Sequence, residues 1–136
     1  SIEACHEVDK LLGIEICKNL FLCTASHTGH CLLMMPGSKP FRTKDLSRQI
    51  GSSRLSFASP AEMEEMLDLA PGSVSVMGLM NDRDHRVRLL IDRDILAHEY
   101  VGCHPCANTA SLKIRLDDLL NKFLPHTGHV PTFVEL

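Results

Sequence analysis

Apolar residues recur along this chain at two spacings, one typical of helices and one typical of strands. Residues 2–12 place their apolar side chains at helical spacing and predict a short N-terminal helix. Continuous apolar runs at residues 16–25 and 31–35 flank the polar segment SHTGH. These runs predict a β-hairpin with Gly29 in its turn.

Boundary residues predict three further helices. Residues 43–51 form a short helix that glycine ends. Ser59-Pro60 opens the next helix, whose acidic first turns suit the helix dipole and which Pro71-Gly72 breaks. Asp117 starts the last helix, Pro125 is expected to end it, and the tail that follows has no regular pattern.

Short runs rich in β-branched or aliphatic residues predict the remaining strands. They are residues 54–57, 73–79, 87–91, 97–102 and 108–116. Because hairpin signals occur among interspersed helices and strands, a strictly parallel sheet is not expected. We therefore expect one α+β domain, residues 1–136, with a mixed, largely antiparallel sheet and flanking helices.

The charge is nearly balanced except in one segment. A formal net charge of −3 argues against a general nucleic-acid-binding protein. Between residues 39 and 54 the only acidic residue is Asp45, against the basic residues Lys39, Arg42, Lys44, Arg48 and Arg54. This segment is a candidate phosphate-facing patch, and a solvated helix face explains it equally well.

The chain carries no membrane or export signal in its apolar pattern. No run of 18 apolar residues occurs, and the acidic first residues lack the apolar centre of a signal peptide. A cytoplasmic protein without membrane contact is expected. The chain begins at Ser1 rather than at methionine, which suggests processing or a shortened N-terminus.

Cys103-His104-Pro105-Cys106 is a C-x-x-C motif, so thiol redox chemistry is one hypothesis. A thioredoxin-like motif precedes a helix, whereas the residues after Cys106 predict a strand. A zinc site is a second hypothesis, with candidate ligands Cys23, His27, His30, Cys31, Cys103, His104 and Cys106. Only one C-x-x-C pair occurs and turn-tip histidines are usually solvated, so neither a metal nor a cofactor is expected.

No protein nucleophile is evident. The G-x-S-x-G motif is missing, because Val76 stands where its last glycine would be. Cys103 and His104 are adjacent, so on a strand they would point to opposite faces and could not act as a nucleophile–base pair. Phosphate-binding glycine motifs of the P-loop and dinucleotide types are also missing from the sequence.

Lys18 and Asn19 interrupt an apolar run, ICKNLFLC. A lysine there must extend to solvent or meet an anion, and an edge-strand residue that prevents aggregation is the alternative. Gly72 and Gly78 allow close backbone approach, so that peptide N–H groups can face a carbonyl or phosphate oxygen. An ordinary helix-to-strand turn is the alternative for this segment.

Four segments in order resemble the YbaK/ProX family of aminoacyl-tRNA deacylases, which is related to the editing domain of bacterial prolyl-tRNA synthetases. They are CKNLFL (17–22), RLSFAS (54–59), LAPGSVSVMGLMND (69–82) and GCHPCANTAS (102–111). The resemblance is greatest to the free-standing branch that removes alanine from mischarged proline tRNA. It implies the editing-domain fold, and the chain would begin inside the family's N-terminal segment.

The resemblance also implies the site residues. Lys18 would lie near the terminal adenosine and phosphate with Asn19 in support, and Gly72 and His104 complete the expected catalytic set. Substrate-binding positions would be Ser73, Val74, Ser75, Val76, Gly78, Gly102, Cys103 and Asn108. Val76 replaces the proline usual in the family's glycine loop. Lys39, Arg42, Lys44 and Arg48 would contact the tRNA.

A trans-editing hydrolase is therefore expected, in which water assisted by the tRNA 2′-OH cuts the ester of alanyl-tRNA for proline. Its partners would be the 3′ end of mischarged tRNA and prolyl-tRNA synthetase, and a monomer is expected. Two alternatives stay open: a non-catalytic binding module of the same fold, and a thiol redox or metal protein. The amino acid removed, among alanine, cysteine, serine and threonine, is not fixed by the sequence.

Overall fold

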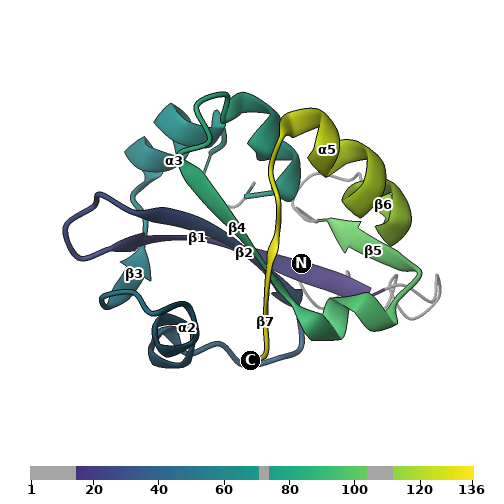
Figure 1. Ribbon diagram of the computed structural model, residues 1–136, viewed down its shortest axis with the longest axis horizontal. Coiled ribbons are helices and arrows are strands. Elements are labelled where there is room, and N and C mark those ends of the chain that lie inside the picture. The colour runs from purple at the N-terminus through teal and green to yellow at the C-terminus, as the bar shows by residue number, and fades with distance from the viewer. Residues whose placement is uncertain (1–14, 71–73, 104–111) are drawn as a thin grey trace.

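The computed structural model describes residues 15–70, 74–103 and 112–136 (Figure 1). In these residues one sheet has the strand order β6-β5-β1-β2-β4-β7, and β3 pairs with β1 beside that path. The strands are β1 (Glu15–Thr24), β2 (His30–Pro36), β3 (Leu55–Phe57), β4 (Val87–Asp92), β5 (Tyr100–Cys103), β6 (Leu112–Arg115) and β7 (Thr132–Val134). The predicted helix at residues 2–12 lies outside the described residues.

Helical segments cover both faces of the sheet (Figure 1). They are α2 (Thr43–Ile50), α3 (Pro60–Leu67), the 3₁₀ helices η1 (Val76–Asn81) and η2 (Arg93–Ala97), α4 (Leu116–Asp118), the π-helical turn η3 (Leu119–Phe123) and α5 (Leu124–Thr127). Among the described residues, no helix is long and apolar enough to cross a membrane.

The predicted hairpin is confirmed. Strands β1 and β2 pair antiparallel from Cys17↔Pro36 to Cys23↔His30, and Thr24 N donates to Gly29 O across the turn at 2.9 Å. Strands β1–β3 and β5–β6 are also antiparallel, whereas β1–β5, β2–β4 and β4–β7 are parallel. The antiparallel ladders hold more paired residues, so the expected mixed, largely antiparallel sheet is confirmed.

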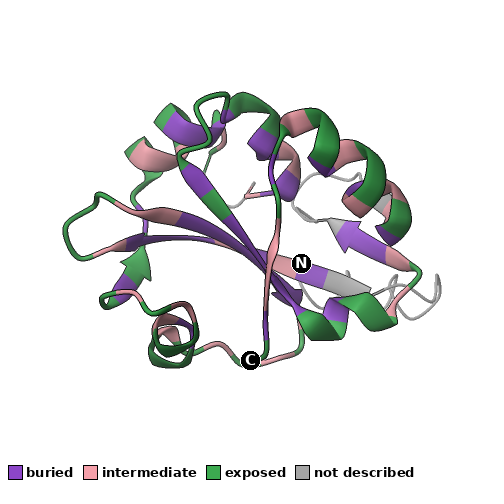
Figure 2. Cartoon of the chain, in the orientation of Figure 1, coloured by how far each residue is buried: buried purple, intermediate pink, exposed green. Residues whose placement is uncertain are grey.

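Alternation along β1 divides the core into two layers (Figure 2). Cys17, Phe21 and Cys23 pack on the face covered by α3, η1 and the segment from α4 to α5. Leu22 packs on the opposite face, against α2, together with the half-buried Leu20. We call these the α3 face and the α2 face. Their separation decides which predicted site residues can meet.

Boundary residues determine where α2 ends and where α3 begins and ends. Helix α2 ends at Gly51, whose φ of +67° is the left-handed conformation that glycine adopts freely. Helix α3 starts at Ser59 in a capping box with Glu62. It ends at Leu67, earlier than the predicted Pro71-Gly72 break, because Asp68 takes a left-handed conformation there.

The strand predicted at residues 73–79 is wrong, because Val76–Asn81 form the 3₁₀ helix η1. The Ser75 hydroxyl accepts a hydrogen bond from the Met77 N–H at 3.2 Å and starts the turn. Val76 and Leu79, three positions apart, then both reach the core. Residues 71–73 lie outside the described residues.

Two predictions about the C-terminal part are also wrong. Pro125 does not end the last helix, because the π-helical turn η3 runs directly into α5 with helical backbone at Phe123 and Leu124, and the Leu124 N–H donates to Leu119 O. The helix ends instead at Gly128, with φ +80°. The tail is not irregular either, since β7 joins the sheet parallel to β4. Three residues are too few for a strand pattern to be recognised in the sequence.

The remaining predicted strands are confirmed with shifted ends. Residues 87–91 fall within β4, and β3 covers most of residues 54–57. The strand predicted from residue 97 starts only at Tyr100, because Arg93–Ala97 form η2. Strand β6 covers Leu112–Arg115, and residues 108–111 lie outside the described part of the chain.

Candidate functional site

Lys18 lies on an internal strand, between β5 and β2, where it pairs with Met35. It is half-buried, points to the α2 face, and its Nζ donates a hydrogen bond to the backbone carbonyl of Lys39. Strand β1 is thus not an edge strand, but among the described residues no strand pairs with Lys18 on the side away from β2. The carbonyl that accepts from Lys18 is neutral, so this contact brings no counter-charge and an anionic group can replace it.

Lys39 is held by two carboxylates. Its Nζ donates to Asp92 Oδ2 at 2.8 Å and to Asp94 Oδ2 at 2.7 Å, and the Asp92 side chain is fully buried. Desolvation opposes the charge, but the hydrogen bonds to Asp92 and Asp94 outweigh it and raise the pKa of Lys39 above 10.5. Lys39 thus fixes the loop whose carbonyl meets Lys18, and its own charge is already compensated.

The register of β5 places the start of the fourth family segment beside β1. Strand β5 runs parallel to β1, with Ile16 opposite Gly102 and Cys17 opposite Cys103. Lys18 follows directly after the last of these paired residues. The predicted residues His104 and Asn108 follow in the sequence and lie outside the described residues, as do Gly72 and Ser73.

Asn19 points to the α3 face, opposite to Lys18, because neighbouring strand residues alternate. The two side chains therefore do not meet, which corrects the expectation that Asn19 supports Lys18 directly. Asn19 is only 9% exposed, yet within the described residues neither Oδ1 nor Nδ2 has a hydrogen-bond partner. A buried amide without partners costs about 1–3 kcal/mol and usually has a functional reason.

Within the described residues, one side of β1 has no strand paired with it at this point. On the side away from β2, strand β5 pairs with residues 15–17 and strand β3 with residues 22–24. Between them, the described residues provide only the Ala58 N–H, which donates to Phe21 O at 2.9 Å. The backbone of Lys18 and Asn19 is thus not covered by a described strand on that side.

The described residues of the predicted glycine loop are mainly structural. Val76 and Gly78 are buried, and Val74 packs against the core on the α3 face. A Cβ on Gly78 would lie 2.6 Å from Leu69 Cδ1. Gly78 therefore lets η1 approach the end of α3, and not a substrate oxygen as the sequence suggested.

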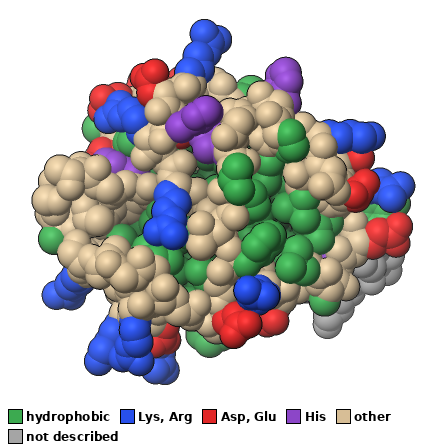
Figure 3. Space-filling view, viewed as in Figure 1, with side chains coloured by type: hydrophobic (Ala, Val, Ile, Leu, Met, Phe, Trp, Pro, Cys, Tyr) green, Lys and Arg blue, Asp and Glu red, His purple; other side chains and the backbone are tan. Residues whose placement is uncertain are grey.

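The basic segment lies on the Lys18 side of the sheet. Arg42, Lys44 and Arg48 are exposed on and beside α2, and Figure 3 shows Lys and Arg side chains gathered over this helix at the lower left. Leu46 of the same helix is buried in the core of the α2 face. The structure thus brings this basic surface and Lys18 to one face, and leaves Asn19 and η1 on the other.

Several polar residues with defined roles were missed by sequence reasoning. Asp82, in the LMND segment, accepts hydrogen bonds from the Arg86 and Val87 N–H groups, each at 2.9 Å, and from His129 Nε2 at 2.8 Å. It therefore fixes the turn into β4. Its position in a family segment was the only sequence signal, and His129 is distant in the chain.

The chain resembles known proteins over nearly its whole length. A family model described as the aminoacyl-tRNA editing domain matches residues 1–122. Prolyl-tRNA editing protein ProX of Acetoanaerobium sticklandii is 32% identical over 136 residues, which cover 100% of this chain and 82% of that protein. Prolyl-tRNA synthetase associated domain-containing protein 1 of Danio rerio is 31% identical over 134 residues, covering 97% and 71%.

Solved structures share the fold. A candidate trans-editing enzyme for prolyl-tRNA synthetase matches with a TM-score of 0.67 and 21% identity, covering 96% of this chain and 78% of that one. A computationally designed epitope scaffold matches with a TM-score of 0.70 and 18% identity, covering 96% and 77%. At these identities the structural likeness concerns the fold alone.

Proposed function

This chain belongs to the aminoacyl-tRNA editing domain family, and on that premise we propose that it removes alanine from mischarged proline tRNA. The family makes it an aminoacyl-tRNA deacylase, an ester hydrolase. The observation that carries the proposal is Lys18, a half-buried ammonium on an internal strand. Within the described residues no carboxylate forms an ion pair with it, which suits a residue that receives a phosphate.

Lys18 would clamp the 3′ end of the tRNA. Exchanging the neutral carbonyl of Lys39 for a phosphate oxygen adds the attraction between opposite charges to the hydrogen bond. The carboxylates of Asp92 and Asp94 keep Lys39 in place, so the exchange does not have to reorganise the loop. Binding energy from this clamp would orient the ester for attack.

Asn19 would supply polar contacts to the substrate. Its buried amide has an unused donor and an unused acceptor, and a ribose hydroxyl or an aminoacyl group could use both. In this proposal the attacking water is assisted by the tRNA 2′-OH, so no protein nucleophile is required.

The selectivity follows from size. A synthetase pocket built for proline cannot strongly reject a smaller amino acid, so a second and smaller pocket must hydrolyse the error. Arg42, Lys44 and Arg48 would contact the acceptor stem on the Lys18 side. We further propose that the protein acts as a cytoplasmic monomer together with prolyl-tRNA synthetase.

Deacylation of alanyl-tRNA for proline tests the proposal, with prolyl-, cysteinyl- and seryl-tRNA as parallel substrates. We expect selective release of alanine, and a fall of at least about 100-fold in Lys18→Ala. Lys122→Ala is the matched control, because this exposed lysine pairs only with Asp118 on its own helical segment. Unchanged turnover in Lys18→Ala overturns the assignment, and binding without turnover in the wild type favours a non-catalytic module.

A further inference from the structure

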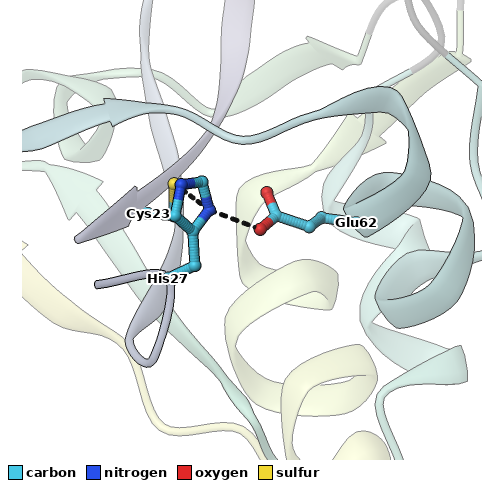
Figure 4. A group of neighbouring side chains, drawn as sticks. All are labelled: Cys23, His27 and Glu62. Atoms are coloured by element: carbon cyan, nitrogen blue, oxygen red, sulfur yellow. Dashed lines mark hydrogen bonds and ion pairs between the residues drawn. The ribbon is translucent and has the colours of Figure 1, made fainter. Parts of the chain in front are cut away.

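Three side chains with metal-binding atoms, Cys23, His27 and Glu62, converge where the hairpin meets α3 (Figure 4), and His30 lies next to Glu62. Cys23 ends β1, His27 lies in the turn, His30 starts β2, and Glu62 lies in the first turn of α3. Ligand atoms of Cys23, His27 and Glu62 all lie within 4.8 Å of one another. This group is separate from the Lys18 region and has no part in the proposed deacylation.

The distances match the edges of a tetrahedral zinc site. Standard zinc bond lengths give about 3.6 Å between sulfur and nitrogen ligands and about 3.4 Å between nitrogen and oxygen ligands. Cys23 Sγ lies 3.5 Å from His27 Nδ1, and His30 Nε2 lies 3.5 Å from Glu62 Oε1. The contact between His27 Nδ1 and Glu62 Oε1 is shorter, at 2.6 Å, because the two atoms share a proton that a metal ion would replace.

His30 gives an independent indication of a ligand. Its side chain is only 6% exposed, which contradicts the expectation of a solvated turn-tip histidine. Its Nε2 is buried and, among the described residues, has no hydrogen-bond partner. The ring stacks on Phe21 with centroids 5.6 Å apart, which holds Nε2 toward Glu62. Nε2 lies 3.5 Å from Glu62 Oε1, and in the tautomer protonated on Nδ1 the buried Nε2 offers a lone pair to a cation.

Glu62 is arranged as a ligating carboxylate. Its Oε2 accepts the Ser59 N–H at 2.8 Å in the capping box, while Oε1 faces both histidines. The Ser59 N–H orients the carboxylate as outer-shell hydrogen bonds orient metal ligands.

The backbone holds these ligands in place without a metal. The His27 N–H donates to Thr24 O at 2.9 Å, and His27 takes a left-handed φ of 57° that aims its ring at α3. Cys31 does not belong to the group, because it packs in the α2-face core.

We propose that Cys23 Sγ, His27 Nδ1 and Glu62 Oε1 bind one zinc ion that ties the end of the hairpin to α3, and that His30 Nε2 moves in from beside Glu62 to complete the site. One sulfur, two imidazole nitrogens and one carboxylate oxygen are all atom types that bind zinc, and together they would form a closed set of four ligands. Binding releases the Cys23 thiol proton, and the proton between His27 Nδ1 and Glu62 Oε1 moves to His27 Nε2 as Nδ1 binds the metal. His27, the most exposed ligand, moves outward by less than about 1 Å to reach zinc geometry.

Cobalt titration of the full chain tests the site, because cobalt replaces zinc and absorbs light. We expect one equivalent of Co²⁺ to give a thiolate-to-cobalt charge-transfer band that Zn²⁺ abolishes. Cys23→Ser should lose the band. His27→Asn, which tolerates the left-handed backbone, and Glu62→Gln should each weaken Zn²⁺ binding by at least about tenfold. Circular dichroism of each variant verifies its fold.

Two control variants identify the thiol. Cys31→Ala should keep the band, and so should Cys103→Ser combined with Cys106→Ser. Loss of the band in the double variant would move the metal to the C-x-x-C motif and overturn the proposal. A wild-type protein without a saturable band at one equivalent would also overturn it. The cobalt titration reads metal binding and not deacylation, so a negative result would overturn the metal site without contradicting the proposed function.

Discussion

The Lys18 ammonium donates its hydrogen bond to the backbone carbonyl of Lys39, whose own ammonium is held by two carboxylates. The two lysines therefore have different roles. Lys39 fixes the position of its loop, and the neutral backbone carbonyl of Lys39 accepts the hydrogen bond from Lys18 in the free protein. Lys39 affects the site by fixing this loop, so removing its side chain should first lower the free energy of unfolding.

Replacing Lys39 by methionine should destabilise the fold by about 3 kcal/mol, because Asp92 would be left as a buried carboxylate without its cation. Asp94→Ala is the matched comparison. Its side chain is 65% exposed, so its loss should cost less than about 1 kcal/mol. Urea unfolding of the three proteins measures both values, and equal losses would contradict this account.

The contribution of Lys39 should also depend on pH. Because its folded pKa lies above the ordinary 10.5, the stabilisation is fully present below pH 10.5 and is lost as the pH rises through the folded value. The difference in unfolding free energy between wild type and Lys39→Met should therefore be constant from neutral pH to about pH 10 and shrink at higher pH. A difference that is the same at pH 8 and well above 11 would show that proton linkage at Lys39 is absent.

Gly78→Ala should destabilise the protein by about 1–3 kcal/mol, since the added Cβ meets Leu69 Cδ1 at 2.6 Å and Leu67 O at 3.3 Å. Gly51→Asn is a suitable control. Its position has φ +67° and open space around it, and asparagine tolerates that conformation. Thermal unfolding should show a lower Tm for Gly78→Ala and a near-native one for Gly51→Asn. A lower Tm for Gly51→Asn than for Gly78→Ala would contradict the close packing of Gly78 against Leu69.

Local signals in the sequence predicted the elements that are made locally. The hairpin around Gly29 and the Ser59 cap of α3 depend on neighbours within a few residues, and both predictions are confirmed. The segment at residues 73–79 was mistaken for a strand because its aliphatic composition fits a buried 3₁₀ turn equally well. Strand β7 forms only because β4 offers it an open edge.

The same limit applies to the candidate site. The family segments identified Lys18, but its partner Lys39 and that residue's partner Asp92 come from distant parts of the chain. Strand alternation, which the sequence does contain, already places Lys18 and Asn19 on opposite faces. Cys23 and Glu62 meet only because α3 folds back on the hairpin, so their spacing in the sequence carries no metal signature.

Asn19→Leu should raise stability while lowering activity. Leucine keeps the approximate shape of the side chain and removes a buried amide that has no partner among the described residues, so the free energy of unfolding should increase by about 1 kcal/mol. If the amide contacts the substrate, as proposed, kcat/KM for deacylation should fall by at least about tenfold, since the lost contacts have no replacement. Unfolding and deacylation are measured on the same preparations. Higher stability with unchanged turnover would remove Asn19 from the site. Lower stability would instead show that the Asn19 amide already has a hydrogen-bond partner in the free protein. The lack of a partner could then no longer support a role for Asn19 in catalysis.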